Sequence, residues 1–525
     1  MTSNNHVGNW PNAAGFQVDA EQRSAIELPV KGTFPRALAG TLYRTGPAYA
    51  QVGDFKLSHW FDGFTQLYRF QIIPDDDQDG ATCKILFNSR RQVDGLMEKA
   101  RKSKRLDDIT FAQKRDPCEG FFGKVMTLFT SAFAKREGPE DLMSGVTVHR
   151  AVHGGGGGNN LLETRTDQGA FKTVDATTLE PKEVITQTKL HPDLTGPMSC
   201  AHAQFDPVTG DAFNFNLAFG RHATYKMYCT SAATGKTEIL ATITEPDIPA
   251  AYLHAFFLTE NYVILCVWSS HYAAGGLKTL WERNVLDALT PFDDAKPVHW
   301  LVVDRKNGNA SNGAVKRFTS KAMFAFHTVN AFEVKNENGT TDLLCDIVEY
   351  PTMEVLQGLY YENLVSDGAG ARDRGIKKST LARYRLKNVT SPSKAPEPAE
   401  SDFRIAFNGD LPTINPTLHT KPYQYVYGIG DHGLSSFYDS IVKVDLKTQV
   451  MKRWSVAKHT PGEPIFVVDE ARKDKEDGGW LLSCVLDGEK STSYLLCLDA
   501  ETLQEVGKAE GDVPWGIGFH GDYHK

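Results

Sequence analysis

The sequence predicts an all-β fold made of repeated hairpins, and among such folds we expect a β-propeller. Short apolar runs alternate with turn residues along the whole chain, a pattern typical of strands and tight turns. Several of these runs end in Asp and are followed by Gly, Asn, Thr or Lys before the next run begins. Asp can accept hydrogen bonds from the backbone two residues ahead, so it favours the start of a hairpin. The repeated aspartates are Asp175, Asp206, Asp304, Asp445 and Asp499.

Hairpins that recur over 525 residues suggest the blades of one radially repeated domain. A pair of β-sandwiches with ordinary turns would give the same local pattern. We expect residues 1–30, which are mostly polar, to form an N-terminal arm, and residues 31–525 to form a single propeller domain. Residues 95–140 interrupt the hairpin pattern and are predicted to be a helical insertion.

Within this insertion, residues 117–133 form an aromatic stripe at helical spacing, with basic residues before it. Such a helix can lie in a membrane interface, or it can pack on its own domain. An oily substrate favours the first interpretation, because that substrate must be collected from lipid. Cys118, at the start of this segment, is either an acylation site or a plain buried thiol. The residues of the stripe are Phe121, Phe122, Val125, Met126, Phe129 and Phe133.

Composition narrows the class of partner. The net charge is −8 and no basic face stands out, which argues against a nucleic-acid partner. The eight cysteines contain no CxxC pair and suit a reducing compartment. The sequence shows neither a secretory signal at its start nor a run of about 18 uncharged apolar residues. We therefore expect a cytoplasmic protein that is soluble or lies on a membrane surface.

Four histidines lie within apolar, strand-like stretches of sequence, whereas most of the other histidines have polar neighbours. The spacings between them are 52, 73 and 193 residues, so they do not form a local metal-binding motif. Any one of them alone is more simply read as a core histidine. On the inner strands of a propeller, however, they could meet at one metal ion, and imidazole is a good ligand for iron. The four are His202, His254, His327 and His520.

Seven blocks of sequence, in the same order, resemble the signature blocks of the carotenoid cleavage oxygenases. They lie at 40–44, 59–63, 200–207, 253–264, 326–333, 462–467 and 518–521. The resemblance implies a seven-bladed propeller with helical insertions that cap the active-site face. It also implies Fe(II) held by His202, His254, His327 and His520, and scission of a carbon–carbon double bond by O2 into two carbonyl products. No protein side chain beyond the metal ligands is then required as a catalyst.

Carboxylates behind the ligands are a further feature of that family. By motif match they are Glu163, Glu463 and, where the family usually has Glu, Asp410. Each would accept the second N–H of a ligand imidazole. The shorter side chain of Asp410 leaves open whether it reaches its histidine directly or through a water molecule.

The substrate can be narrowed by the same resemblance. The branch of the family that cleaves phenolic alkenes places a Lys directly before the first of these carboxylates, where this chain has Leu162. The segment 116–122 resembles that of carotenoid, retinoid and torulene cleavers. We expect a torulene-like or β-carotene-like polyene or an apocarotenoid. The alternatives are a stilbene or phenylpropanoid alkene, such as resveratrol or isoeugenol, and a non-catalytic propeller that only binds lipid.

Overall fold

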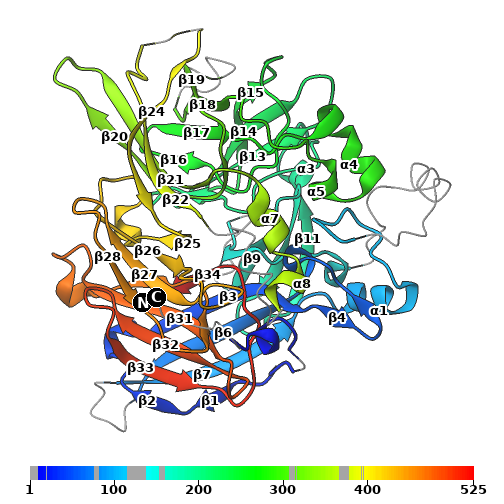
Figure 1. The fold of residues 1–525 in the computed structure, drawn as a ribbon, viewed down its shortest axis with the longest axis vertical. Helices are drawn as coiled ribbons and strands as arrows, with labels where there is room; N and C mark the ends of the chain where they lie inside the picture. Colours follow the sequence, from blue (N-terminus) through cyan, green and yellow to red (C-terminus); the bar gives the residue numbers. More distant parts are fainter. Residues whose placement is uncertain are drawn as a thin grey trace, which may run out of the picture.

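Seven β-sheets are arranged in a ring in the computed structural model (Figure 1). The structure describes residues 10–18, 20–75, 82–114, 138–152, 160–306, 314, 316–365, 378–391, 393 and 395–525. Each sheet has four to six strands and is a blade of the propeller. The prediction of a seven-bladed β-propeller is therefore confirmed, and the paired β-sandwich alternative is excluded.

The first three blades use the N-terminal half of the chain and, in one position, its C-terminal end. From the outer to the inner strand, the first blade consists of β1 (Ile26–Leu28), β7 (Cys83–Arg91), β6 (Phe64–Pro74), β3 (Gly40–Tyr49) and β34 (Gly521–His524). The second consists of β11 (Pro181–Thr186), β10 (Ala170–Asp175), β9 (Leu161–Arg165) and β8 (Thr147–Arg150). The third consists of β15 (Thr237–Ile243), β14 (Thr224–Thr230), β13 (Ala212–Ala218) and β12 (Gln204–Phe205).

The other four blades follow in chain order. The fourth consists of β23 (Glu397–Pro398), β19 (Lys316–Ser320), β18 (Val298–Asp304), β17 (Tyr262–Val267) and β16 (Phe257–Leu258). The fifth consists of β24 (Glu400–Ala406), β22 (Thr380–Leu386), β21 (Thr341–Tyr350) and β20 (Phe324–Lys335), and the sixth of β28 (Met451–Trp454), β27 (Ser440–Asp445), β26 (Tyr425–Gly430) and β25 (Gly409–Thr413). The seventh consists of β2 (Val30–Gly32), β33 (Glu505–Glu510), β32 (Thr492–Asp499), β31 (Gly479–Asp487) and β29 (His459–Pro461), with β30 (Ile465–Val468) also paired to β31.

The ring is closed by exchange between the two ends of the chain. The C-terminal strand β34 pairs with β3, so that Thr41 lies opposite His524. In return, β2 pairs with β33 of the last blade. Closure of this kind leaves no gap between the first and last blades, and it buries the C-terminal segment that carries His520.

The aspartate turns behave as the sequence predicts. In each of the five, one carboxylate oxygen accepts a hydrogen bond from the backbone N–H two residues ahead, at 2.7 to 3.1 Å. Each turn lies between two antiparallel neighbours of one blade, for example β10 and β11, or β32 and β33. The repeated motif therefore marks blade hairpins, as expected.

The described part of the predicted arm packs on the propeller. Phe16 and Val18 are buried in the main core, and β1 and β2 extend two blades at their edges. Of the predicted insertion, α1 (Asp94–Ser103) is helical, whereas residues 117–133 lie outside the described residues and their predicted helix stays a prediction.

Short helices gather on one side of the ring, on the right in Figure 1. None of the helices in the described residues is both long and apolar enough to cross a membrane. Besides α1, they are α3 (Gln187–Leu190), α4 (Leu277–Glu282), α5 (Val285–Ala288), α7 (Glu354–Gly358) and α8 (Tyr361–Leu364). A small hairpin, β4 (Gln51–Val52) and β5 (Phe55–Lys56), lies outside the blades.

Candidate metal centre

The four singled-out histidines meet where the innermost strands surround the axis of the propeller. His327 belongs to β20, while His202, His254 and His520 lie within a few residues before β12, β16 and β34. These strands are the inner edges of four different blades, and β16 contacts both β12 and β20. Four residues that are far apart in sequence therefore reach one point because each comes from the start or interior of an inner strand.

One nitrogen from each imidazole lies within 4.8 Å of the corresponding nitrogens of the other three. The Nε2 atoms of His327 and His520 are 3.2 Å apart. The ring of His202 contacts all three of the others, with centroid distances of 4.3 to 4.8 Å. Nε2 of His202 is buried and has no hydrogen-bond partner among the described residues.

Three of the imidazoles donate their second N–H to a carboxylate. Asp410 accepts from Nδ1 of His327 at 2.7 Å, and Glu463 accepts from Nδ1 of His520 at 2.7 Å. Motif matching predicts both acids in this role, without assigning each to a particular histidine. The shorter Asp410 reaches its histidine directly, without a bridging water. Such bonds fix the tautomer, so that Nε2 of each ring is free of hydrogen and faces the other imidazoles.

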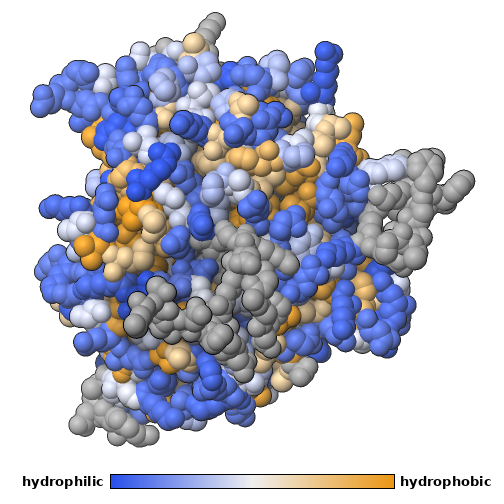
Figure 2. Space-filling view, viewed as in Figure 1, coloured by the Kyte–Doolittle hydropathy of each residue, from blue (hydrophilic) through white to orange (hydrophobic). Residues whose placement is uncertain are grey.

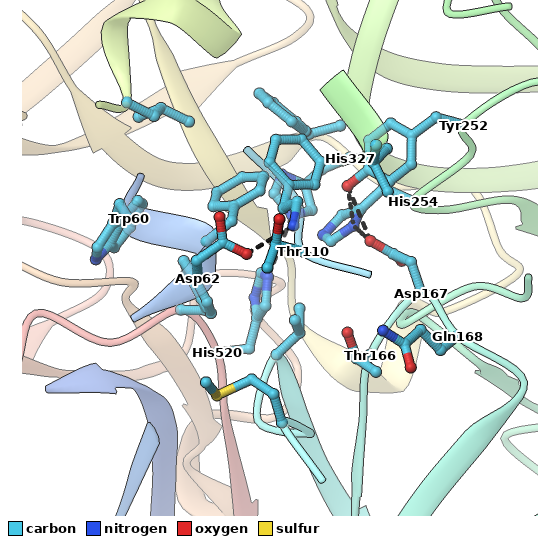
Figure 3. Close-up of a pocket in the computed structure, with 18 of the residues that line it drawn as sticks. Trp60, Asp62, Thr110, Thr166, Asp167, Gln168, Tyr252, His254, His327 and His520 are labelled. Carbon is cyan, nitrogen blue, oxygen red and sulfur yellow. Dashed lines mark hydrogen bonds and ion pairs between the residues drawn. The ribbon is translucent and has the colours of Figure 1, made fainter. Parts of the chain in front are cut away.

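Asp167 is the third carboxylate, in place of the predicted Glu163. Its Oδ2 lies 2.8 Å from Nδ1 of His254 (Figure 3). The assignment of Glu163 to this role is therefore wrong. Glu163 lies within β9 and pairs with Arg165 two residues along the same strand, and it also accepts from the backbone of Val152. Alternate residues of a strand face the same side, which directs Glu163 to Arg165 and leaves the turn after β9 to present Asp167.

Because Asp167 and not Glu163 is the carboxylate behind His254, a different residue occupies the position that distinguishes the phenol-cleaving branch. The position directly before this carboxylate is Thr166, not Leu162, and Thr166 lines the cavity beside the histidines. Leu162 is buried in a separate apolar cluster with Tyr43 and Val148. Neither residue is a Lys, so the comparison with the phenol-cleaving branch gives the same answer at the corrected position.

Electrostatics favour the neutral form of two of the four imidazoles. Burial and the neighbouring imidazoles hold the pKa of His202 well below its usual value. Burial also lowers the pKa of His520 to about 4, although Glu463 acts in the opposite direction. Burial alone would raise the pKa of Asp410 and of Glu463, but the adjacent His327 and His520 lower both overall. Near neutral pH, His202 and His520 therefore offer imidazole lone pairs, and Asp410 and Glu463 are ionised.

This arrangement fits a divalent metal ion. Four imidazole nitrogens lie around one centre, and one of them is a buried polar atom with no partner among the described residues. An unpaired buried nitrogen costs free energy unless a ligand satisfies it. Imidazole suits iron, copper, zinc and nickel, so the donor set defines a metal site without specifying the element.

An apolar cavity adjoins the metal centre (Figure 3). His254, His327 and His520 form part of its wall. α5 and α7 contribute Val285 and Val355, so the helices cover this cavity. Its apolar lining includes Trp60, Phe61, Ile109, Phe111, Met143, Val146, Met198, Phe326, Leu359 and Phe519.

Comparison with known proteins gives consistent similarities. Residues 15–525 match the family model described as retinal pigment epithelial membrane protein. A torulene dioxygenase of Fusarium fujikuroi is 40% identical over 98% of this chain and 93% of its own length. A carotenoid dioxygenase of Neurospora crassa is also 40% identical, over 98% of this chain and 90% of its own length. The fold matches that of a Synechocystis apocarotenoid oxygenase with a TM-score of 0.76 at 21% identity, covering 98% of both chains.

Proposed function

This chain belongs to the family of retinal pigment epithelial membrane protein and the carotenoid oxygenases, and on that premise we propose that it is a non-haem Fe(II) dioxygenase of carotenoids. It uses O2 to cleave one carbon–carbon double bond of a carotenoid or apocarotenoid. One oxygen atom enters each product, so the two alkene carbons become two carbonyl groups. The observation that carries this proposal is the convergence of four imidazoles beside an apolar cavity.

His202, His254, His327 and His520 hold the iron in this proposal. A bound ferrous ion supplies the activation of O2, which apolar side chains cannot provide. The protein's part is to fix the open side of the site and to exclude water from it. Asp167, Asp410 and Glu463 orient three of the ligands through the bonds described above.

The cavity supports a polyene as the substrate. Most of its wall is aliphatic or aromatic, as an extended hydrocarbon requires. The position where a phenol-binding Lys is expected holds Thr166, whose neutral hydroxyl cannot stabilise a phenolate as an ammonium group does. Torulene, β-carotene and their shortened aldehydes are therefore favoured over stilbenes and phenylpropanoids.

Collection of such a substrate from a lipid surface is the second part of the proposal. Leu277 and Leu280 of α4 are 59% and 36% exposed, and Val365, after α8, is 37% exposed. Figure 2 shows apolar surface between α7 and α4, on the side where helices cover the cavity. Together with the stripe in residues 117–133, this surface supports peripheral association of a cytoplasmic protein with membrane.

Metal loading and product analysis test the catalytic proposal. The purified protein is stripped with a chelator, reloaded with Fe(II), and incubated with torulene, β-carotene, an apocarotenal, resveratrol and isoeugenol in air. We expect aldehyde products from polyenes only, dependent on Fe(II), with oxygen from ¹⁸O2 in both fragments. Turnover of the phenolic alkenes alone would reject the substrate class, and purified protein that binds polyenes but no iron would indicate a lipid-binding propeller.

Vesicle sedimentation tests the membrane association. Serine at Phe121, Phe122, Phe129 and Phe133 should release the protein from neutral phosphatidylcholine vesicles. The same change should leave iron content and turnover of detergent-dispersed substrate intact, because these residues are remote in sequence from the metal ligands. Equal sedimentation of the two proteins would reject this segment as the anchor.

A further inference from the structure

Two tyrosine hydroxyls reach the carboxylates behind the metal centre. The hydroxyl of Tyr252 donates to Oδ2 of Asp167 at 2.8 Å (Figure 3). The hydroxyl of Tyr350 donates to Oδ2 of Asp410 at 2.5 Å. An ionised carboxylate can only accept hydrogen bonds, so the phenol is the donor in both cases. Each forms a chain of tyrosine, aspartate and histidine that ends at the metal position.

In the hydrogen-bonded chain through Asp167, a single carboxylate oxygen accepts from two side-chain donors. Oδ2 accepts from both Tyr252 and Nδ1 of His254, while Oδ1 accepts from the backbone N–H of Ala201. Tyr252 itself lines the cavity, and its hydroxyl also lies 3.3 Å from Nδ1 of His254. If the phenol hydroxyl were removed, Oδ2 would therefore accept a hydrogen bond only from the imidazole.

In the Asp410 chain the donors are divided between the two oxygens. Oδ1 accepts from Nδ1 of His327 and from the backbone of Leu411, while Oδ2 accepts from Tyr350. The hydroxyl of Tyr350 is in turn bonded to that of Tyr438, which lines the cavity. With both oxygens engaged, the carboxylate cannot rotate away from His327 without breaking a bond.

The third carboxylate has a charged donor instead. Oε2 of Glu463 accepts from Arg44 at 2.6 Å and from the backbone of Gly521 at 2.9 Å. Its other oxygen accepts from His520. Each of the three ligand-orienting acids is thus held by one further side-chain donor, a phenol for each aspartate and a guanidinium for the glutamate.

We propose that Tyr252 and Tyr350 are positioning residues that hold Asp167 and Asp410 on the metal ligands and limit the negative charge these acids pass to the metal. A carboxylate that loses a donor binds the imidazole N–H more strongly, which makes the imidazole a more electron-rich ligand. Such a ligand favours Fe(III) over Fe(II). The effect should be larger at Tyr252, because this phenol shares its acceptor oxygen with the imidazole.

The test compares Tyr252→Phe and Tyr350→Phe with the wild type, each loaded with Fe(II). Both variants should shift the Fe(III)/Fe(II) midpoint potential to more negative values, with the greater shift in Tyr252→Phe. The EPR signal of the ferrous protein with nitric oxide should change shape in parallel. At saturating polyene, kcat should fall about tenfold while KM stays within about twofold.

A matched control separates this role from packing. Tyr427 is also buried, and its hydroxyl donates to the backbone carbonyl of Ala500 in a cluster away from the metal. Tyr427→Phe should leave the potential and the EPR signal unchanged, whatever it does to thermal stability. Wild-type potential and EPR signal in both test variants, or equal changes in Tyr427→Phe, would overturn the proposal.

The test does not depend on the substrate assignment, and it has an alternative if the Phe variants do not fold. The inference rests on the proposed function only in requiring iron at the four histidines, and the potential and EPR readouts need no substrate. A wrong substrate assignment would therefore not affect them. If the variants do not fold, 3-fluorotyrosine can replace tyrosine throughout the wild-type chain. The more acidic phenols donate more strongly and should move the potential in the positive direction, and an unchanged potential would reject the proposal.

Discussion

Oδ1 of Asp410 lies 2.7 Å from Nδ1 of His327, a direct hydrogen bond between residues 83 positions apart in the chain. Both side chains are almost completely buried, with 6% and 10% of their surface exposed. An aspartate at this position thus reaches the imidazole without help from water. The contact joins the inner strands of two adjacent blades, β20 and β25, and makes the metal site depend on how those blades pack.

Asp410→Asn should weaken iron binding by about 10- to 100-fold, because a neutral amide holds the His327 N–H less firmly than a carboxylate. Competition with a chelator, followed by iron analysis, measures the change. Asp439→Asn is the control, since Asp439 makes a comparable bond of 2.8 Å to His432 in another part of the same blade. Equal iron loss from both variants would contradict an effect specific to the metal site.

Asp167→Asn and Glu163→Gln should separate into two phenotypes. We expect Asp167→Asn to lose iron and activity, because its carboxylate orients His254. Glu163→Gln should instead lose about 3–5 kcal/mol of unfolding free energy, because it removes the negative charge from a buried ion pair with Arg165. Urea unfolding and iron content measured on both proteins distinguish these outcomes. Iron loss confined to Glu163→Gln would restore the assignment made from sequence.

His59 should make the apo-protein less stable in acid. Burial lowers the pKa of His59 to about 3, against 6.5 in the unfolded chain, so only the unfolded chain takes up a proton as the pH falls below 6.5. Stability contributed by the neutral ring is complete above pH 6.5 and is lost toward pH 3. At pH 5 the loss amounts to about 2 kcal/mol.

Urea unfolding of the apo-protein at pH 8 and pH 5 measures this effect. His59→Gln should reduce the difference in unfolding free energy between the two pH values by that amount, whatever its own stability. His222→Gln is the control, because His222 is exposed. The same pH dependence in His59→Gln and in the wild type would contradict the assignment.

Thr166→Lys should impair polyene cleavage without loss of iron. Thr166 lines the cavity next to Asp167, and an ammonium group there must be desolvated whenever an apolar chain fills the cavity. We expect kcat/KM for β-carotene or torulene to fall about tenfold or more, since an unpaired buried charge costs at least a few kcal/mol. Thr166→Val is the control of similar shape and should retain activity. Unimpaired cleavage by Thr166→Lys would argue that the polyene does not pass this residue.

The sequence alone determined the repeated hairpins and the four histidines, and its resemblance to a known family favoured the seven-bladed propeller over a pair of β-sandwiches. The aspartate turns are local, because each carboxylate bonds the backbone two or three residues ahead, so their sequence spacing contains the structural information. The histidines were identified from the apolar, strand-like sequence that surrounds each of them. Their convergence needed only the assumption that inner strands of different blades meet at one axis.

Only the tertiary structure decided which acid stands behind His254, whereas Asp410 and Glu463 were predicted from sequence motifs. Glu163 and Asp167 are four residues apart, but Glu163 lies within β9 and Asp167 lies in the turn that follows it. Strand alternation in β9 pairs Glu163 with Arg165, and the chain then leaves the strand and carries Asp167 to His254. The two supporting tyrosines could not be identified from the sequence either. Tyr350 and Asp410, for example, are 60 residues apart and belong to two adjacent blades. A long-range hydrogen bond of this kind has no spacing rule, so it becomes visible only when the blades are packed.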